Sequence, residues 1–288
     1  MTMKKKKRRP SLPSFFFRWF LVLFAIGVFA VTLFVLYNPL IKEFDLRERL
    51  QANLRASVLL DRRGEELLTL SPSRVSWTPL EKIPLFFRRA VIAVEDRRFY
   101  EHKGVDFRGM LRAVYYNLRQ RETAQGGSTI TQQLAKNLLL TKEKTITRKL
   151  LEAGYAVKIE QKYSKDEILE FYLNDIYFGH GVYGVEGAAR FYFAKHIWEL
   201  EVDEQALLVG LIRGPELYSP YRHPERALKR RNLMLSLLAE DGLLSKREAE
   251  HWSAKPLTVQ ENPSYLSRGG SFADYIEEQL AEKYGWSN

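Results

Sequence analysis

The sequence predicts a mainly α-helical domain preceded by one long apolar segment. Apolar residues recur at helical spacing along most of the chain beyond that segment. Two capping-box patterns, Thr129 with Gln132 and Ser164 with Glu167, mark the starts of helices. Strand signals are few, with one short strand and turn at residues 57–65. The length of 288 residues is sufficient for one sizeable domain and an appendage.

The net charge of +10 is concentrated at the N-terminus. Residues 1–18 form a basic arm with seven basic residues and no acidic one, so the rest of the chain carries only +3. A domain with so balanced a charge is not a general nucleic-acid binder, and no nucleic acid is expected as a partner. The chain has no cysteine, which excludes a disulfide framework, a thiolate metal site and a cysteine nucleophile.

Residues 19–37 form an uncharged run of nineteen residues, about the length at which a helix crosses ~30 Å of hydrocarbon. Trp19 and Tyr37 lie at its two ends, where aromatic rings favour the membrane interface. A cleaved signal peptide is the alternative, but its apolar core is usually shorter, and the exit after Tyr37 lacks a small-residue cleavage site. We therefore expect an uncleaved single-pass anchor with residues 1–18 in the cytoplasm and the chain after Asn38 on the outer face.

The segment between the anchor and the domain, residues 38–55, is expected to be a linker that is charged and helical from residue 41 on. After the strand and turn, Pro84 suits the first turn of a helix. Residues at spacing four give that helix an apolar face, formed by Phe86, Ala90 and Val94. The helix ends at Glu95.

A second helix is expected to begin after Asp106, a suitable N-cap residue. Its apolar stripe consists of Phe107, Leu111, Val114, Tyr115 and Leu118, and it is flanked by Arg108, Arg112 and Arg119. Two interpretations stay open. The stripe faces the core of an ordinary helix, or it lies in the membrane interface with the arginines toward lipid headgroups.

The second half of the chain alternates helices and loops. Helices are expected at residues 168–174, 203–211 and 224–240, and Gly242 stops the last of them. Residues 177–187 contain four glycines and several aromatic residues, a composition typical of a loop with close backbone approaches.

The most informative segment starts where the first of these helices ends. It reads E-D-x-x-F-x-x-H-x-G-x-D and supplies Glu95, Asp96, Phe99, His102, Gly104 and Asp106. Burying charge without partners costs several kcal/mol, so a core helix does not favour adjacent carboxylates. A site that must accept a proton, in contrast, does favour such carboxylates. A charged helix end is the plain alternative.

A second motif, G-S-T-I-T-Q-Q-L-A-K-N, occupies residues 127–137. Helix capping accounts for Ser128 and Thr129. It leaves Gln133 and Lys136 unexplained, which favours a functional interpretation of this segment.

Cationic residues surround one further carboxylate, Glu152. On a helix, Lys144, Arg148 and Glu152 would share one face at spacing four, and Lys136 and Lys149 could add charge to the same pocket. These residues form surface ion pairs worth a few tenths of a kcal/mol, or they hold a diphosphate, with or without a divalent metal. The cluster by itself leaves both interpretations open.

Together these motifs resemble the glycosyltransferase family 51 domain, the peptidoglycan glycosyltransferases found alone or at the front of class A penicillin-binding proteins. The resemblance covers residues 56–255, with a fourth motif at 165–174 that runs into 177–179 and a fifth within 214–231. It implies a lysozyme-like, two-lobed helical domain preceded by one N-terminal transmembrane helix. Its small lobe would be partly embedded in the membrane.

The resemblance implies polymerisation of lipid II, a disaccharide-pentapeptide on undecaprenyl diphosphate, onto a growing glycan strand. Glu95 would act as general base on the 4-hydroxyl of the acceptor sugar, and Glu152 would help to steady the departing diphosphate, with inversion at the anomeric carbon. The substrate-binding residues that it implies are Asp96, Phe99, His102, Ser128, Thr129, Gln132, Gln133, Lys136, Asn137, Lys144, Arg148 and Lys149. A divalent cation, Mg²⁺ or Mn²⁺, is compatible with the site but not demanded by the sequence, and no protein metal site is expected.

The resemblance further implies a bacterial inner-membrane protein with its catalytic domain on the periplasmic face. Other cell-wall synthesis proteins are candidate partners. No S-x-x-K, S-x-N or K-T-G triplet occurs, so no transpeptidase site lies within these residues. Residues 256–288 are expected to be a C-terminal linker and resemble the segment that leads into a transpeptidase domain. Monofunctional and bifunctional enzymes both stay open.

Two other functions are compatible with parts of the sequence. A membrane-anchored, lysozyme-like peptidoglycan hydrolase would also use a glutamate in a helical fold, and inverting hydrolysis needs two carboxylates at a suitable separation. The cationic cluster and the stripe directed toward lipid argue against it. A non-catalytic scaffold for cell-wall proteins would not explain the motifs.

Overall fold

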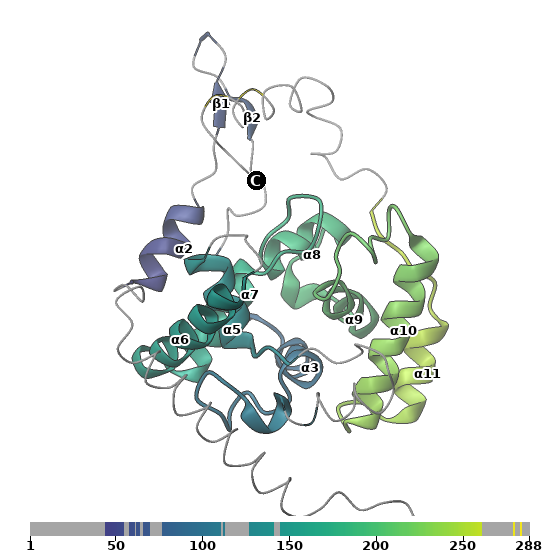
Figure 1. The fold of residues 1–288 in the computed structure, drawn as a ribbon. Coiled ribbons are helices and arrows are strands. Elements are labelled where there is room, and N and C mark those ends of the chain that lie inside the picture. Colours follow the sequence, from purple (N-terminus) through teal and green to yellow (C-terminus); the bar gives the residue numbers. More distant parts are fainter. Residues whose placement is uncertain are drawn as a thin grey trace, which may run out of the picture.

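The computed structural model describes residues 44–54, 58–60, 62–63, 66–69, 77–110, 112, 127–140, 145–260, 279 and 283. This part of the chain is mainly helical, as predicted (Figure 1). Its α-helices are α2 (Leu46–Leu54), α3 (Leu85–Glu95), α5 (Ile130–Leu139), α6 (Ile146–Lys162), α7 (Lys165–Asp175), α8 (Val185–Phe193), α9 (Val202–Leu211), α10 (Pro224–Glu240) and α11 (Lys246–Ala254). Short 3-10 helices are η1 (Leu80–Lys82) and η2 (Ile197–Glu199).

The predicted strand pairs with a second one. β1 (Val58–Leu60) and β2 (Glu66–Thr69) form an antiparallel sheet in which Val58 lies opposite Thr69. Figure 1 shows this sheet away from the helices. The helical body therefore supplies the hydrophobic core.

Helix α3 begins after Pro84, whose φ of −51° suits a helix N-cap position, and ends where Asp96 leaves the helical conformation at φ −153°. Its buried face is Phe87, Ala90 and Val91, whereas Phe86 and Val94 are only half-buried. The predicted face, Phe86, Ala90 and Val94, does pack against the core, but the side of α3 that is buried is wider and includes Phe87 and Val91. The reason is tertiary, because α3 packs against both α9 and α10.

Helix α5 packs against α6 and α7. Ile130, Leu134 and Leu138 are buried at spacing four, as an amphipathic helix requires. Both predicted capping boxes are confirmed, Thr129 with Gln132 at the start of α5 and Ser164 with Glu167 at the start of α7. Helix α7 begins at Lys165 rather than at residue 168, because the capping box places its first turn directly after Ser164.

Helices α9, α10 and α11 pack together on the other side of α3 (Figure 1). The predicted helix at 224–240 is confirmed with the same bounds, and α9 begins one residue earlier than predicted. Gly242 follows α10 with φ +76°, a conformation that glycine adopts without strain. The segment 177–187 is a loop only to Gly184, because α8 begins at Val185.

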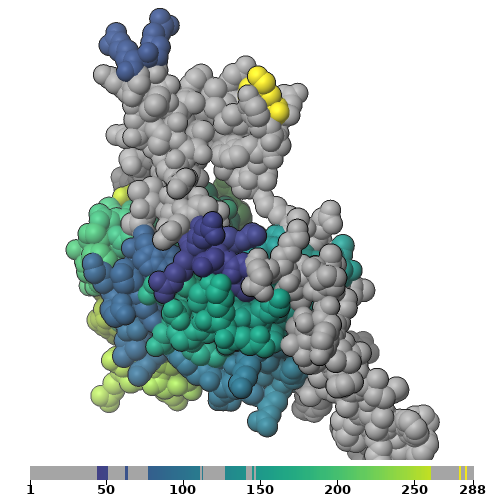
Figure 2. Space-filling model, turned by 90° about the vertical axis from the view of Figure 1, so that its left-hand side faces the viewer, coloured from purple at the N-terminus to yellow at the C-terminus, as the bar shows by residue number. Residues whose placement is uncertain are grey.

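Helix α2 lies in the segment predicted as a helical linker. Its Leu46 and Leu50 are buried, and it packs against α5 and α7. Figure 2 shows this helix, in purple, lying across the teal surface of the later helices. Arg47 adds an ion pair with Glu167 at 2.9 Å. This helix therefore contributes to the body rather than extending away from it.

The predicted anchor, residues 19–37, and the basic arm, residues 1–18, lie outside the described residues. Among the residues that are described, no helix combines the length and the apolar character needed to cross a bilayer.

Candidate active site

Glu95 occupies the last position of α3, with its side chain partly exposed. Its Oε2 accepts a hydrogen bond from Gln133 Nε2 at 3.1 Å. Its Oε1 is buried and has no hydrogen-bond partner within the described part of the chain. One oxygen is thus held while the other is free to accept a proton.

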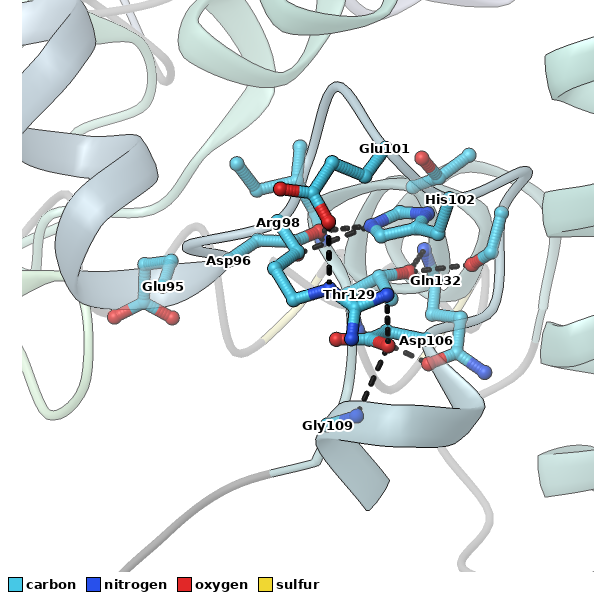
Figure 3. A network of polar contacts seen from close by, with 12 residues as sticks. Glu95, Asp96, Arg98, Glu101, His102, Asp106, Gly109, Thr129 and Gln132 are labelled. Atoms are coloured by element: carbon cyan, nitrogen blue, oxygen red, sulfur yellow. Dashed lines mark hydrogen bonds and ion pairs between the residues drawn. The ribbon is translucent and has the colours of Figure 1, made fainter. Parts of the chain in front are cut away.

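Asp96 points elsewhere, although it follows Glu95 directly. Figure 3 shows Glu95 directed away from the network that holds Asp96 and His102. The Asp96 carboxylate lies 2.9 Å from His102 Nε2 and accepts the Ile130 backbone N–H at 3.0 Å. Asp96 and His102 are both more than nine-tenths buried. Asp96 therefore joins the loop after α3 to the first turn of α5.

Gly104 allows the same loop to approach α6 closely. It has φ +89°, and a Cβ atom there would lie 2.7 Å from the backbone of Ala156. Its carbonyl accepts a hydrogen bond from Thr129 Oγ1 at 2.6 Å, and Thr129 also caps α5 together with Gln132. The first and second sequence motifs are thereby joined by buried polar contacts.

The second carboxylate, Glu152, is 2% exposed. Lys149 Nζ lies 2.6 Å from Glu152 Oε2 and also donates to Ser128 Oγ at 2.6 Å. Arg148 is farther away, with 3.5 Å between its Nη2 and Glu152 Oε1, which is an ion pair without a hydrogen bond. Since Glu152 is buried, this cluster differs from the exposed ion pairs of a surface helix.

Lys144 lies outside the described residues. Helix α6 begins at Ile146, after the N-cap residue Thr145. The prediction that Lys144 shares a helix face with Arg148 and Glu152 therefore stays a prediction.

The remaining predicted substrate-binding residues divide into two groups. Phe99 is fully buried, and Asp96, His102, Thr129 and Gln132 are at most 7% exposed. In this structure these five side chains form a buried framework behind the site, and the expectation that they contact a ligand stays a prediction. Lys136 is exposed, and Asn137 donates to Asp175 Oδ2 at 3.1 Å.

Two residues near Glu95, Tyr172 and Arg230, were not predicted from the sequence. The Tyr172 hydroxyl donates to Gln133 Oε1 at 3.1 Å, and Tyr172 lies within the fourth motif without any signal of its own. Arg230, on α10, has a buried Nη2 with no hydrogen-bond partner in the described residues. Burial lowers the pKa of the Arg230 guanidinium, and the charge of Glu95 acts in the opposite direction. Only the packing of helices distant in sequence brings α7 and α10 close to Glu95.

The helical turn at residues 107–110 follows Asp106, whose Oδ1 accepts the Gly109 N–H at 2.9 Å, as an N-cap residue does. Phe107 and Met110 are 41% and 42% exposed. Most of the predicted stripe, including Leu111, Val114, Tyr115 and Leu118, lies outside the described residues. Phe107 is thus exposed, and the two interpretations of the stripe stay open.

No cluster of three or more side chains suited to holding a metal ion is found in the part of the chain that the structure describes. The Glu152 carboxylate is already in contact with Lys149 Nζ at 2.6 Å.

Comparison with known proteins places these features in one family. The transglycosylase family model matches residues 63–239. Penicillin-binding protein 1A of Aquifex aeolicus is 45% identical over 231 residues, which cover 80% of this chain and 32% of that protein. Penicillin-binding protein 1F of Bacillus subtilis is 40% identical over 233 residues, covering 81% and 33%. Penicillin-binding protein 1B of Haemophilus influenzae is 43% identical over 211 residues, covering 72% and 27%. The chain spans about a third of the length of the curated relatives it matches.

Proposed function

The chain belongs to the transglycosylase family, and we propose that it is a peptidoglycan glycosyltransferase that polymerises lipid II into glycan strands. The observation that carries this proposal is the contrast between two carboxylates. Glu95 has one oxygen held by Gln133 and one buried oxygen without a partner. Glu152 is neutralised by Lys149, with Arg148 beside it. One carboxylate is suited to accept a proton, and the other is part of a cationic site.

In the proposed reaction, Glu95 removes the proton from the 4-hydroxyl of the acceptor sugar. That oxygen attacks the anomeric carbon of the donor, the bond to the diphosphate breaks, and the configuration inverts. A diphosphate leaving group needs neutralisation of charge more than it needs a proton. Lys149 and Arg148 supply positive charge at this site. Ser128 accepts a hydrogen bond from Lys149, and Lys136 lies on α5, the helix that follows Ser128.

The framework residues support this chemistry indirectly. The Asp96–His102 pair and the contact between Thr129 and Gly104 hold the loop after α3 against α5 and α6. Catalytic groups need this kind of support, because small displacements cost large factors in rate. A divalent cation would draw most of its ligands from the diphosphate of the substrate, as Mg²⁺ does at phosphate sites.

The proposal includes the membrane. The helical domain is proposed to have a lysozyme-like, two-lobed form, anchored by residues 19–37 in the bacterial inner membrane with its site on the periplasmic face. Exposed Phe107 and Met110 are compatible with a lobe that touches the bilayer. Since the lipid substrate is confined to the bilayer, an enzyme held there meets it directly. Residues 256–288 are proposed to be a linker, and other cell-wall synthesis proteins are proposed as partners.

The test is an assay in which the detergent-solubilised chain receives labelled lipid II and, in parallel, purified sacculi. Elongated glycan and released undecaprenyl diphosphate are the expected products. Soluble muropeptides from sacculi, with lipid II unchanged, would contradict the proposal and support the lysozyme-like hydrolase. Heat-treated protein is the control for non-enzymatic breakdown of the lipid.

A further inference from the structure

Tyr172 lies behind the site on α7, with only 1% of its surface exposed. Its hydroxyl donates to Gln133 Oε1 at 3.1 Å, and Gln133 Nε2 donates to Glu95 Oε2 at 3.1 Å. Three helices thus contribute one residue each to a continuous chain of hydrogen bonds that ends at the proposed base. Tyr172 itself is too deeply buried to contact a substrate.

The direction of this chain follows from the chemistry of an amide. Gln133 has a carbonyl end that only accepts and an NH₂ end that only donates. Turned around, Gln133 would bring its carbonyl oxygen against the Glu95 carboxylate, and the two acceptors would repel each other. The hydroxyl proton of Tyr172 would then lose its acceptor, since Gln133 Oε1 is the only one that it has in the described part of the chain.

The protonation state of Tyr172 supports this direction. Burial raises the pKa of Tyr172 well above its usual value, and the negative charge of Glu95 acts in the same sense. The hydroxyl therefore remains a donor at any pH at which the protein works. Asp175 and Asp96 add to this effect, whereas Arg230 on α10 brings an opposite charge toward Glu95.

We infer that Tyr172 is a positioning residue for the reaction, which acts through Gln133 to hold Glu95 Oε2 and so to aim the free Oε1 at the acceptor hydroxyl. This inference rests on the proposed function, because it takes Glu95 as the base. It predicts an effect on the chemical step rather than on substrate binding, since Tyr172 has no surface from which to contact lipid II.

The chain offers a matched control in Tyr192. That residue is also fully buried, and its hydroxyl donates to the backbone carbonyl of Phe178 at 2.7 Å. The change to phenylalanine removes the same atom from a buried tyrosine in both variants. Only the Tyr172 hydroxyl is connected to Glu95, through the side chain of Gln133.

The kinetic test compares Tyr172→Phe and Tyr192→Phe in the full chain with lipid II. We expect kcat to fall about tenfold in Tyr172→Phe, with KM changed by less than about twofold, because a misaligned base slows the chemical step. Tyr192→Phe should keep both constants near the parent values. In a Gln133→Leu background, Tyr172→Phe should have no further effect on kcat. Full additivity of the two changes, or an equal loss in Tyr192→Phe, would overturn the inference.

A second measurement does not need activity. Thermal unfolding of the full chain gives a double-mutant cycle between Tyr172→Phe and Glu95→Gln. Coupling is expected when Gln133 is present and should vanish in the Gln133→Leu background. Absence of coupling in both backgrounds overturns the inference. If the parent chain does not polymerise lipid II, the proposed function fails, while this cycle still decides whether Tyr172 acts on Glu95.

Discussion

Ser128, just before the N-cap of α5, and Gln133, in its first turn, lie five residues apart, and each contacts a different carboxylate or its partner. Ser128 Oγ accepts a hydrogen bond from Lys149, the partner of Glu152, whereas Gln133 donates to Glu95. The N-terminal part of α5 therefore connects the proposed base with the proposed diphosphate site. A shift of this helix would disturb both.

Glu95→Gln should abolish polymerisation without unfolding the chain. Loss of a general base typically costs ~100- to 10,000-fold in rate, and glutamine keeps the shape of the side chain. Initial rates with labelled lipid II measure this. Glu101→Gln is the matched control, because Glu101 is an exposed carboxylate in the following loop, paired with Arg98. Near-parent synthesis by Glu95→Gln would show that another group is the base.

Lys149→Ala should slow the reaction at limiting lipid II by roughly tenfold or more, because charge-assisted contacts to phosphate oxygens are strong. Within the described part of the chain, it also leaves buried Glu152 with only its 3.5 Å contact to Arg148. Rates at limiting and saturating lipid II measure the effect. Lys162→Ala is the control, since Lys162 lies at the far end of the same helix and contacts the Phe44 carbonyl. Unchanged kinetics in Lys149→Ala would reduce the cluster to a structural ion pair.

Gly104→Ala should lower the free energy of unfolding by ~3 kcal/mol or more. The left-handed conformation costs about 1–2 kcal/mol for alanine, and the new Cβ would collide with the Ala156 backbone at 2.7 Å. Gly181→Ala separates the two contributions, because Gly181 has φ +73° but no atom within 4 Å of such a Cβ. Thermal unfolding of both variants is the measurement. Equal losses would mean that the close approach to α6 contributes nothing.

Arg231→Met should destabilise the domain by ~3–5 kcal/mol, the range for breaking a buried charge pair. Arg231 is 1% exposed, donates to the carbonyls of Ser253, Lys255 and Pro256, and lies 3.6 Å from Asp203. The change releases the segment after α11 and removes the cation that lies 3.6 Å from Asp203. Arg226→Met, an exposed position on the same helix, should change stability by less than about 0.5 kcal/mol. Denaturant unfolding that finds the two variants alike would refute this role.

A fluorophore at residue 107 should enter an apolar environment when the full chain is reconstituted in anionic vesicles. The chain has no cysteine, so Phe107→Cys supplies the only thiol for labelling. The emission of an environment-sensitive dye should shift to the blue relative to the same label on Leu233→Cys, an exposed position on α10. Equal emission at both positions would argue that the turn at 107–110 does not touch lipid.

The sequence by itself determined the helical class, the capping boxes and the bounds of α10, because these depend on contacts between residues close in the chain. Thr129 with Gln132 and Ser164 with Glu167 need only a helix start and a spacing of three. It also determined the family, since the motifs around Glu95, Gln133 and Glu152 occur in order. The anchor at 19–37 and the site roles remain predictions.

Only the tertiary structure decided how those motifs meet. Nothing in the spacing of Glu95 and Asp96 indicates that one points toward Gln133 and the other toward His102. That difference arises because α3 ends between them and the chain turns toward α5. Burial of Phe99, the position of Tyr172 behind Gln133 and the close approach of Gly104 to Ala156 likewise depend on packing between helices distant in sequence. Periodicity reports which face of one helix is apolar, and it carries no information about which other helix covers that face.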